Sequence, residues 1–480
     1  MMKFIEKRID KHIEFTDKHM EFTEEQNYAF QQYVNKENIF VTGPGGSGKS
    51  MFIKKVVAHA NENGIKLDVC ALTGCAAILL ECGAKTLHSW GGLGLANGDI
   101  NTIAKSIVDN KYKRIPWLKV KVLVIDEISM LSYKLFELIE LIARKTRKTE
   151  KLFGGIQVIF CGDFFQLPPV GNSAEPLSEK FCFECPLFDE MFLNHNKIQF
   201  TKIFRQTDPI YSEILNSIRV NKLSQKHIDI LHTCVEKKHD IIDNIRPTII
   251  HPLKFPVERI NNNSLELLEG EEKIFTRKQE ILSDTELTAK QLEKCKHVTE
   301  KQIEFEFLTL EKSINCNKTM RLKVGAQVMC IINKDFHNTP NPICNGSQGI
   351  VQSFHKETGN PIVKFNNGVI KEIHNHSWIS DKIPNVCIKQ IPLILAWAVT
   401  IHKVQGSTID VAEIDIGSDV FECGQSYVAL SRVTDLKGLY LKSFDPSRIK
   451  VNLKVQQFYE TISSFSKDKK LEEEKVLSIF

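Results

Sequence analysis

The chain has 480 residues, with 42% hydrophobic and 25% charged side chains, and its formal net charge is +4. A chain of this length is too long for one hydrophobic core, so we expect about two to four domains. The composition is that of a globular protein, and no apolar run approaches the ~20 residues that cross a bilayer. The near-balanced charge restricts any nucleic-acid surface to a local groove.

The N-terminal segment 1–20 mixes acidic and basic side chains without an apolar centre, unlike a secretory signal or a transit peptide. We therefore expect a soluble intracellular protein without a membrane partner. It would lie in the nucleus of a eukaryote, or in the cytoplasm of a bacterium or a virus-infected cell. The 13 cysteines are scattered, and the single pair at metal-ligand spacing, Cys182 and Cys185, indicates buried thiols more than a metal site.

Along the chain, the first recognisable pattern is a capping box formed by Thr23 and Gln26 at the start of a helix. On this interpretation Gln26 only caps the helix. A second role, in which Gln26 reads a base edge of a nucleotide, stays open because a nucleotide-binding loop follows.

Residues 43–50 match the phosphate-binding pattern G-x-x-x-x-G-K-[ST] at every fixed position. An apolar strand at 39–41 precedes them and a helix at 51–60 follows, as this loop requires. The glycines let backbone N–H groups point at a polyphosphate, to which a lysine adds positive charge and a serine a hydroxyl for Mg²⁺. The predicted nucleotide-binding residues are Gly43, Pro44, Gly45, Gly46, Ser47, Gly48, Lys49 and Ser50.

A strand at 67–72 ends at Thr73, and small residues at 74–77 open the next helix. Small residues let a sugar-phosphate backbone approach closely, although ordinary packing of a helix on a sheet explains them equally well. His88 and Trp90 follow, and a lone histidine and tryptophan normally have a structural role and not a functional one.

A buried strand at 120–125 ends in Asp126 and Glu127. Behind a phosphate loop, such a pair has a chemical use, because Asp126 can hold the Mg²⁺ that Ser50 also binds. Glu127 can orient and deprotonate the attacking water. A second buried strand at 157–161 leads to Gln166, which can contact the γ-phosphate.

Arg205 lies at the end of the segment 198–205 and is either an arginine finger or a surface charge, which spacing does not decide. The charge-rich segment 271–311 indicates no chemistry. Short strands between 324 and 373, with an Asn367-Gly368 hairpin signal, predict a small β-barrel-like insertion.

Taken together, these stretches resemble the Pif-type (petite integration frequency) DNA helicases of superfamily 1B, from about residue 22 to 441. The most specific segment is 129–166, which includes Phe-Gly-Gly-Ile-Gln at 153–157. RecD-like and Dda-like helicases share the pattern GD-x-x-Q-L-P-P-V but are less similar across that segment. Only 42 residues precede the phosphate loop in this sequence, which resembles the near-minimal core of bacterial or viral members.

The resemblance implies an α/β fold with two RecA-like P-loop domains that bind ATP between their parallel sheets. The first would span 1–200, with a small strand-separating wedge at about 91–116. The second would span 201–321 and 386–450, interrupted by an SH3-like β insertion at 322–385. A helical tail would follow at 451–480.

The resemblance also implies roles for single residues, with ATP and Mg²⁺ as cofactors. Gln26 would contact adenine, and Mg²⁺ would be held by Ser50 and Asp126. The catalytic residues would be Lys49, Asp126, Glu127 as the base, Gln166 as the γ-phosphate sensor, and the arginine fingers Arg205 and Arg432. The residues that match motifs lining the DNA groove are Thr73, His88, Phe164, His402, Gln405 and Thr408.

The expected function is therefore an ATP-dependent helicase that moves 5′→3′ on single-stranded DNA and unwinds 5′-tailed duplexes, monomeric when isolated. G-quadruplexes or RNA–DNA hybrids are further substrates in replication, repair or recombination. Two alternatives stay open. One is a superfamily 1 RNA helicase, because no motif visibly reads a 2′-hydroxyl. The other is an ATP-switched DNA-binding protein that does not unwind.

Overall fold

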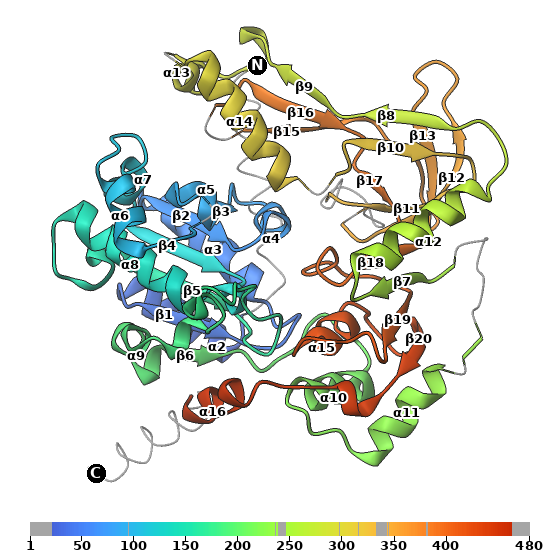
Figure 1. Ribbon diagram of the computed structural model, residues 1–480, viewed down its shortest axis with the longest axis horizontal. Coiled ribbons are helices and arrows are strands. Elements are labelled where there is room, and N and C mark those ends of the chain that lie inside the picture. Colours follow the sequence, from blue (N-terminus) through green and yellow to red (C-terminus); the bar gives the residue numbers. More distant parts are fainter. Residues whose placement is uncertain are drawn as a thin grey trace.

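The computed structural model describes residues 22–462, except 95, 236, 239–245, 297, 315, 333–342, 344 and 381–382. Two parallel sheets lie next to each other, and an antiparallel region lies beyond the second sheet (Figure 1). The predicted α/β class with two parallel sheets is confirmed. Among the described helices, none combines the length and apolar character that crossing a bilayer requires. The segment 1–20 and the tail after residue 462 lie outside the described residues.

The first sheet has six parallel strands: β1 (Ile39–Thr42), β2 (Leu67–Ala71), β3 (Lys85–Thr86), β4 (Val122–Asp126), β5 (Gln157–Gly162) and β6 (Lys197–Gln199). Their order across the sheet is β3-β2-β4-β5-β1-β6. Strands β4 and β5 are continuous apolar runs, as expected for parallel strands that are covered on both faces. Thr42 pairs with Gly162, and Ala71 with Asp126, so the carboxyl ends of these strands meet at one edge.

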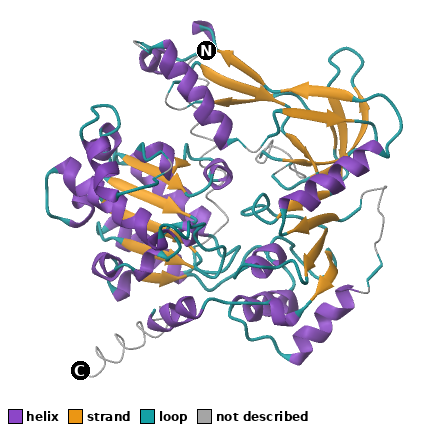
Figure 2. Cartoon of the chain, viewed as in Figure 1, coloured by secondary structure: helices purple, strands orange, loops and turns teal. Residues whose placement is uncertain are grey.

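Helices cover both faces of this sheet (Figure 2). They are α2 (Glu24–Val34), α3 (Lys49–Glu62), α4 (Gly74–Leu79), α5 (Leu87–Gly91), α6 (Ile100–Val108), α7 (Ile115–Lys119), α8 (Tyr133–Arg147) and α9 (Pro186–Met191). Helix α8 starts at the N-cap Ser132, whose hydroxyl accepts the N–H of Leu135. It ends in basic residues, which suit the negative end of the helix dipole.

The second sheet has four parallel strands: β7 (Thr248–His251), β18 (Ala398–Thr400), β19 (Ala412–Ile416) and β20 (Leu439–Phe444). Their order is β18-β7-β19-β20. The helices of this part are α10 (Pro209–Arg219), α11 (Gln225–Val235), α12 (Lys254–Glu266) and α15 (Gln425–Leu430). One strand therefore comes from before the antiparallel region and three come from after it.

The antiparallel region contains β8 (Lys273–Thr276), β9 (Lys278–Ile281), β10 (Thr319–Leu322), β11 (Gln327–Cys330), β12 (Gln348–Phe354), β13 (Pro361–Phe365), β14 (Ile370–Glu372), β15 (His376–Ile379), β16 (Val386–Gln390), β17 (Leu393–Leu395), α13 (Ala289–Cys295) and α14 (Glu300–Ser313). The predicted Asn367-Gly368 hairpin is confirmed by the pairing of β13 with β14. The charge-rich segment 271–311 supplies β8, which pairs with β10, and β9, which pairs with β16. The SH3-like topology and the domain boundaries stay predictions.

The chain crosses between the two sheet domains twice. It passes from the first to the second after β6, and it returns after β20 through helix α16 (Leu453–Thr461), which lies below the first sheet in Figure 1. Val455, Phe458 and Ile462 belong to the hydrophobic core of the first domain. The ring of Phe458 stacks on Phe183 with centroids 4.3 Å apart. The last described helix therefore completes a core that was begun more than 400 residues earlier.

Candidate active site between the two sheets

The glycine loop 43–50 joins β1 to α3 at the carboxyl edge of the first sheet. Gly46 has φ +84°, and a Cβ there would lie 2.5 Å from the Cβ of Arg205, so no other residue fits. The ammonium of Lys49 donates to the carbonyl oxygens of Gly43 at 2.7 Å and Pro44 at 3.0 Å. Burial lowers the pKa of Lys49, and the charges of Asp163, Glu127 and Asp126 oppose this shift.

Two carboxylates follow β4 at the same edge. Burial, and next the charge of Glu127, raise the pKa of Asp126 to about 7. Glu127 has φ 56° and ψ 43°, a left-handed conformation that costs about 1–3 kcal/mol in a residue with a side chain. Such strain is typical of functional sites. An acidic pair of this kind fits a hard divalent cation, for which Asp126 and the Ser50 hydroxyl offer the oxygen ligands.

Two arginines approach the glycine loop from the other side. Arg205 lies on the crossing segment after β6, and Arg432 lies just after α15. A Cβ on Gly45 would be 3.5 Å from Nη2 of Arg432 and 3.6 Å from Nη1 of Arg205. Arg432 donates to the carbonyl oxygens of Val428 and Ser407 and to the hydroxyl of Ser431. Arg205 donates to the carbonyl oxygens of Ser431 and Gly406.

In the part of the chain that the structure describes, neither arginine has an ion pair. Burial, and next the positive charge of Arg205, lower the pKa of Arg432, while Glu127 acts in the opposite direction. Burial likewise lowers the pKa of Arg205. Two neighbouring cations that are largely withdrawn from water and lack a carboxylate partner are unfavourable by themselves. The loop, the lysine and the two arginines together fit a polyphosphate anion.

Tyr427 on α15 also reaches the glycine loop, because its hydroxyl accepts the N–H of Gly45 at 2.8 Å. Burial raises the pKa of this tyrosine to about 12, so it stays neutral. Sequence reasoning missed this contact, although Tyr427 lies in the same short motif as Arg432. The second domain thus contacts the loop through a hydroxyl as well as through guanidinium groups.

Gln26 caps its helix and also contacts the glycine loop. Its Oε1 accepts the N–H of Thr23, which completes the predicted capping box, and its Nε2 donates to the carbonyl oxygen of Ser47 in the loop. Gln166 is buried where the two domains meet, since a Cβ on Gly424 would lie 2.6 Å from its carbonyl oxygen. Adenine contact and phosphate sensing stay predictions.

The residues predicted to line a DNA groove come from the starts of α4 and α5 in the first domain and from the segment 402–408 in the second. Thr73 is at the start of α4, where its hydroxyl accepts the N–H of Ala76, and His88 is on α5. The segment 402–408 lies between β18 and β19, and a Cβ on Gly406 would be 2.8 Å from Leu79 of α4. The side chain of Gln405 is buried, and its Nε2 has no hydrogen-bond partner among the described residues.

Phe164 lies in the hydrophobic core of the first domain. Its side chain is only 2% exposed and packs among aromatic rings of the first domain, including those of Phe40, Phe183 and Phe458. The ring offers almost no exposed surface on which a base could stack, and a place for Phe164 in the DNA groove stays a prediction. The neighbouring Phe165 is buried as well, and its ring stacks on Tyr459 of α16.

A buried network lies directly behind the loop. Arg219 of α10 forms two 2.8 Å hydrogen bonds with the carboxylate of Asp163, which follows β5. The hydroxyl of Tyr459 on α16 donates to the same carboxylate at 3.1 Å and lies 2.5 Å from the Thr42 hydroxyl at the end of β1. The network links the first domain, the crossing helix α10 and the returning helix α16.

Replacing Arg219 with methionine should lower the free energy of unfolding by about 3–5 kcal/mol, because it leaves the buried Asp163 carboxylate without its cation. Urea denaturation of the full chain measures this loss. The double variant Asp163→Asn/Arg219→Met should recover part of it. Arg448→Met, which removes a half-exposed arginine paired with Asp445, is the control. Equal losses in Arg219→Met and Arg448→Met would contradict the prediction.

Two further groups of side chains have the residue types of a metal site. Cys182 and Cys185 are buried thiols in the aromatic core, as the sequence favoured. His251, Asp415 and Asp419 lie close enough together to hold an ion. However, Nδ1 of His251 accepts the N–H of Leu253, so the ring proton is on Nε2, which faces Asp419 at 3.3 Å. These contacts describe a hydrogen-bonded histidine.

The fold and the site define a class of protein: a P-loop nucleotide-binding protein with two RecA-like domains, whose site is completed by arginines from the facing side. A family model described as PIF1-like helicase matches residues 21–229. Bacteroides Pif1 in complex with ADP-AlF4 is 30% identical, with a TM-score of 0.71, and the match covers 92% of this chain and 97% of that one. The chain belongs to the PIF1-like helicase family.

A second relative, and a second structure of Bacteroides Pif1, extend the comparison. The human ATP-dependent DNA helicase PIF1 is 32% identical over 442 residues, which cover 92% of this chain and 63% of the human protein. Bacteroides Pif1 bound to single-stranded DNA is 29% identical, with a TM-score of 0.60, and covers 92% of this chain and 97% of that one. The chain thus spans less than two thirds of the length of curated relatives such as these.

Proposed function

We propose that this protein is an ATP-dependent DNA helicase that moves 5′→3′ along single-stranded DNA and unwinds 5′-tailed duplexes. The observation that carries the proposal is that Arg205 and Arg432, which have no ion pair among the described residues, are held against the glycine loop from the facing side. A site shared in this way closes on a triphosphate and opens when the terminal phosphate leaves. The relatives named above, which bind ADP-AlF4 and single-stranded DNA, support it.

In the proposed reaction Glu127 orients the attacking water and accepts its proton. Lys49, Arg205 and Arg432 compensate the negative charge that develops on the γ-phosphate. Ser50 and Asp126 would hold Mg²⁺, which neutralises charge on the phosphate oxygens when it is bound.

Two glutamines have supporting roles in the proposal. Gln26 contacts the adenine, and Gln166 senses the γ-phosphate. Loss of that phosphate removes the anion between the arginines and the glycine loop, so the domains separate. Since Thr73 is on one side and His402, Gln405 and Thr408 are on the other, separation changes the spacing of the DNA contacts. Repeated closing and opening moves the strand.

The test combines two measurements on the full chain. ATP hydrolysis is compared with and without single-stranded DNA, and unwinding is compared between 5′-tailed and 3′-tailed duplexes. We expect strong stimulation by DNA and unwinding of the 5′-tailed duplex. An absence of stimulation, or preference for the 3′ tail, would overturn the proposal. Stronger stimulation by a matched RNA strand would instead indicate an RNA helicase.

A further inference from the structure

The strongest unexplained feature is a basic face on the outside of the first domain, formed by two segments, 105–121 and 144–151. Together they hold 11 of the chain's 63 lysines and arginines but only 2 of its 59 acidic residues. The rest of the chain therefore has more acidic than basic side chains. A strong local excess of one charge on a nearly neutral protein indicates a binding surface for a polyanion.

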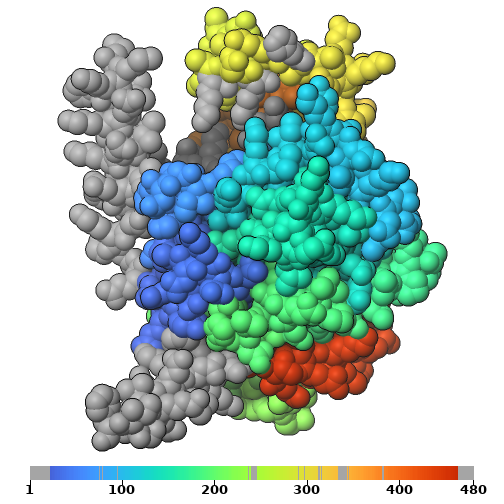
Figure 3. Space-filling view, turned by 90° about the vertical axis from the view of Figure 1, so that its left-hand side faces the viewer, coloured from blue at the N-terminus to red at the C-terminus, as the bar shows by residue number. Residues whose placement is uncertain are grey.

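The two segments are adjacent in the fold. Arg147, near the end of α8, donates to the carbonyl oxygens of Val120 and Gly154, and so joins the end of this helix to the start of β4. Lys145 of α8 donates to Asn101 of α6 at 3.4 Å. Figure 3 shows the cyan α6–α7 segment next to the blue-green segment of α8 on one side of the molecule.

The cations of this face are available for a ligand. Nine of them are exposed and have no ion pair among the described residues: Lys105, Lys111, Lys113, Arg114, Lys119, Lys121, Lys145, Lys148 and Lys151. Arg144 is different, because it pairs with Glu140 and Glu150. Exposed apolar side chains lie between the cations, with Tyr112 exposed by 74% and Leu118 by 45%.

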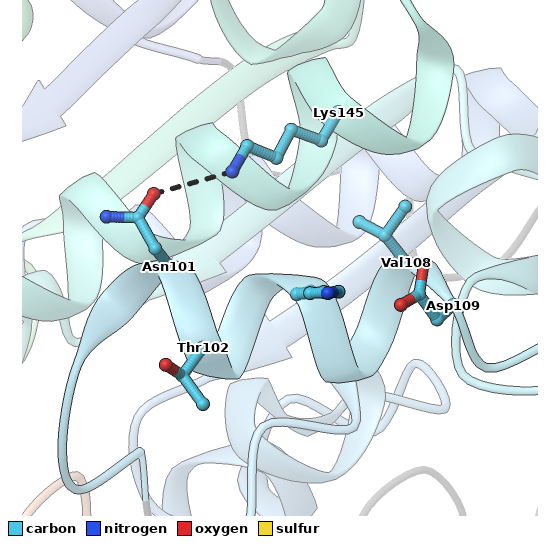
Figure 4. A pocket seen from close by; sticks show the side chains of 6 residues that line it. Asn101, Thr102, Val108, Asp109 and Lys145 are labelled. Atoms are coloured by element: carbon cyan, nitrogen blue, oxygen red, sulfur yellow. Dashed lines mark hydrogen bonds between the residues drawn. The ribbon is translucent and has the colours of Figure 1, made fainter.

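A cavity of about 490 Å³ opens between α6 and α8 on this face. It is lined by Asn101, Thr102, Lys105, Val108, Asp109 and Lys145, and Figure 4 shows Lys145 extending from α8 toward Asn101 on α6. Two lysines at such a cavity can bind phosphate oxygens, while the amide and hydroxyl offer neutral hydrogen bonds. Asp109 lies at one end, so the cavity is not uniformly basic.

We infer that this basic face binds the phosphate backbone of double-stranded DNA, independently of sequence. A duplex presents one negative charge about every 1.7 Å of its axis, which suits a broad face with many unpaired cations. Single strands are bound instead in grooves with stacked aromatic rings, and the described part of this face has one strongly exposed aromatic side chain, Tyr112.

The face lies on the side of the first domain that is turned away from the second sheet (Figure 1), so it is separate from the nucleotide site. It also overlaps the predicted wedge segment 91–116, in which Lys105, Lys111, Lys113 and Arg114 lie. The inference rests on the proposed function, since it gives the duplex a place to be held while one strand passes between the domains. None of these cations takes part in the nucleotide site described above, so they can be changed without touching that site.

The test uses the triple variant Lys119→Glu/Lys121→Glu/Lys151→Glu, which lies outside the predicted wedge. The control is Lys222→Glu/Lys226→Glu/Lys301→Glu, which changes the net charge equally at exposed lysines elsewhere. The probe is a blunt duplex, with dissociation constants measured over a range of salt. We expect the face variant to bind at least about tenfold more weakly, with a salt slope reduced by about one for each phosphate that is no longer bound.

Single-stranded DNA binding and DNA-stimulated ATP hydrolysis should be the same in the two variants, whereas unwinding of the 5′-tailed duplex should be slower in the face variant. Equal duplex binding by the two variants, or an equally large weakening of single-strand binding in the face variant, would overturn the inference. If the unmodified protein shows no DNA-stimulated hydrolysis, the proposed function fails instead. Melting temperatures and the corresponding triple alanine variant separate these outcomes from misfolding.

Discussion

Arg432→Ala is expected to lower the rate of DNA-stimulated ATP hydrolysis by about 10³–10⁵-fold, the range that arginine fingers contribute in related nucleotide hydrolases. The guanidinium is already held by the carbonyl oxygens of Val428 and Ser407, so it needs little reorganisation when charge develops on the phosphate. Arg205→Ala should have a similar effect, because both groups lie beside Gly45. Steady-state hydrolysis at saturating ATP and DNA measures the loss.

The matched control is Arg448→Ala, at a half-exposed arginine of the same domain that forms an ion pair with Asp445. Arg432→Lys should recover only a small part of the rate, because an ammonium keeps the charge but not the planar fork. Arg432→Ala should cost less stability than the loss of a buried arginine that has a carboxylate partner. The reason is that burial already disfavours the charged form of Arg432, as the lowered pKa shows. A near-normal rate would place Arg432 outside the active site.

Glu127→Gln is expected to lower hydrolysis by about 10²–10⁴-fold while ATP binding is retained, because the amide keeps the shape of the side chain but accepts no proton. Single-turnover hydrolysis and nucleotide binding are measured separately. Glu190→Gln, at an exposed glutamate without an ion pair among the described residues, is the control. A variant that hydrolyses ATP normally would exclude Glu127 as the base.

The same variant has a second readout. The charge of Glu127 is the second cause, after burial, that raises the pKa of Asp126 to about 7. Removing that charge should lower the pKa of Asp126, so this carboxylate stays ionised to a lower pH. On lowering the pH, binding of Mg²⁺ with nucleotide should therefore begin to weaken at a lower pH in Glu127→Gln than in the unmodified protein. A merely structural role for Glu127 would not produce this shift.

The chemistry on the first sheet was predictable because its residues follow strands directly. Gly43, Asp126 and Gly162 each stand at the carboxyl end of a buried apolar run, and parallel pairing brings such ends together. Arg205 was ambiguous for the opposite reason. Its position beside the loop depends on where the crossing segment passes, which no local pattern states.

What the sequence did not predict depends on contacts between distant segments. The Asp163 carboxylate meets Arg219 and Tyr459, which lie 56 and 296 residues away in the chain. Likewise, β8 and β9 are half-exposed strands in a charge-rich segment, and they form only because β10 and β16 pair with them. In both cases the stabilising partner is in another part of the chain, which no local sequence pattern identifies.

The return of α16 to the first domain has a mechanical consequence. Two bodies joined by one linker can turn about each other in any direction, but here the chain connects them at two points, after β6 and again before α16. Rotation about the line through these two points is then the easiest relative motion, and twisting is restrained. The nucleotide site and the segments around Thr73 and 402–408 would then open together, by proportionate amounts, about this single axis. The release of one phosphate would move one domain relative to the other by one step in a defined direction.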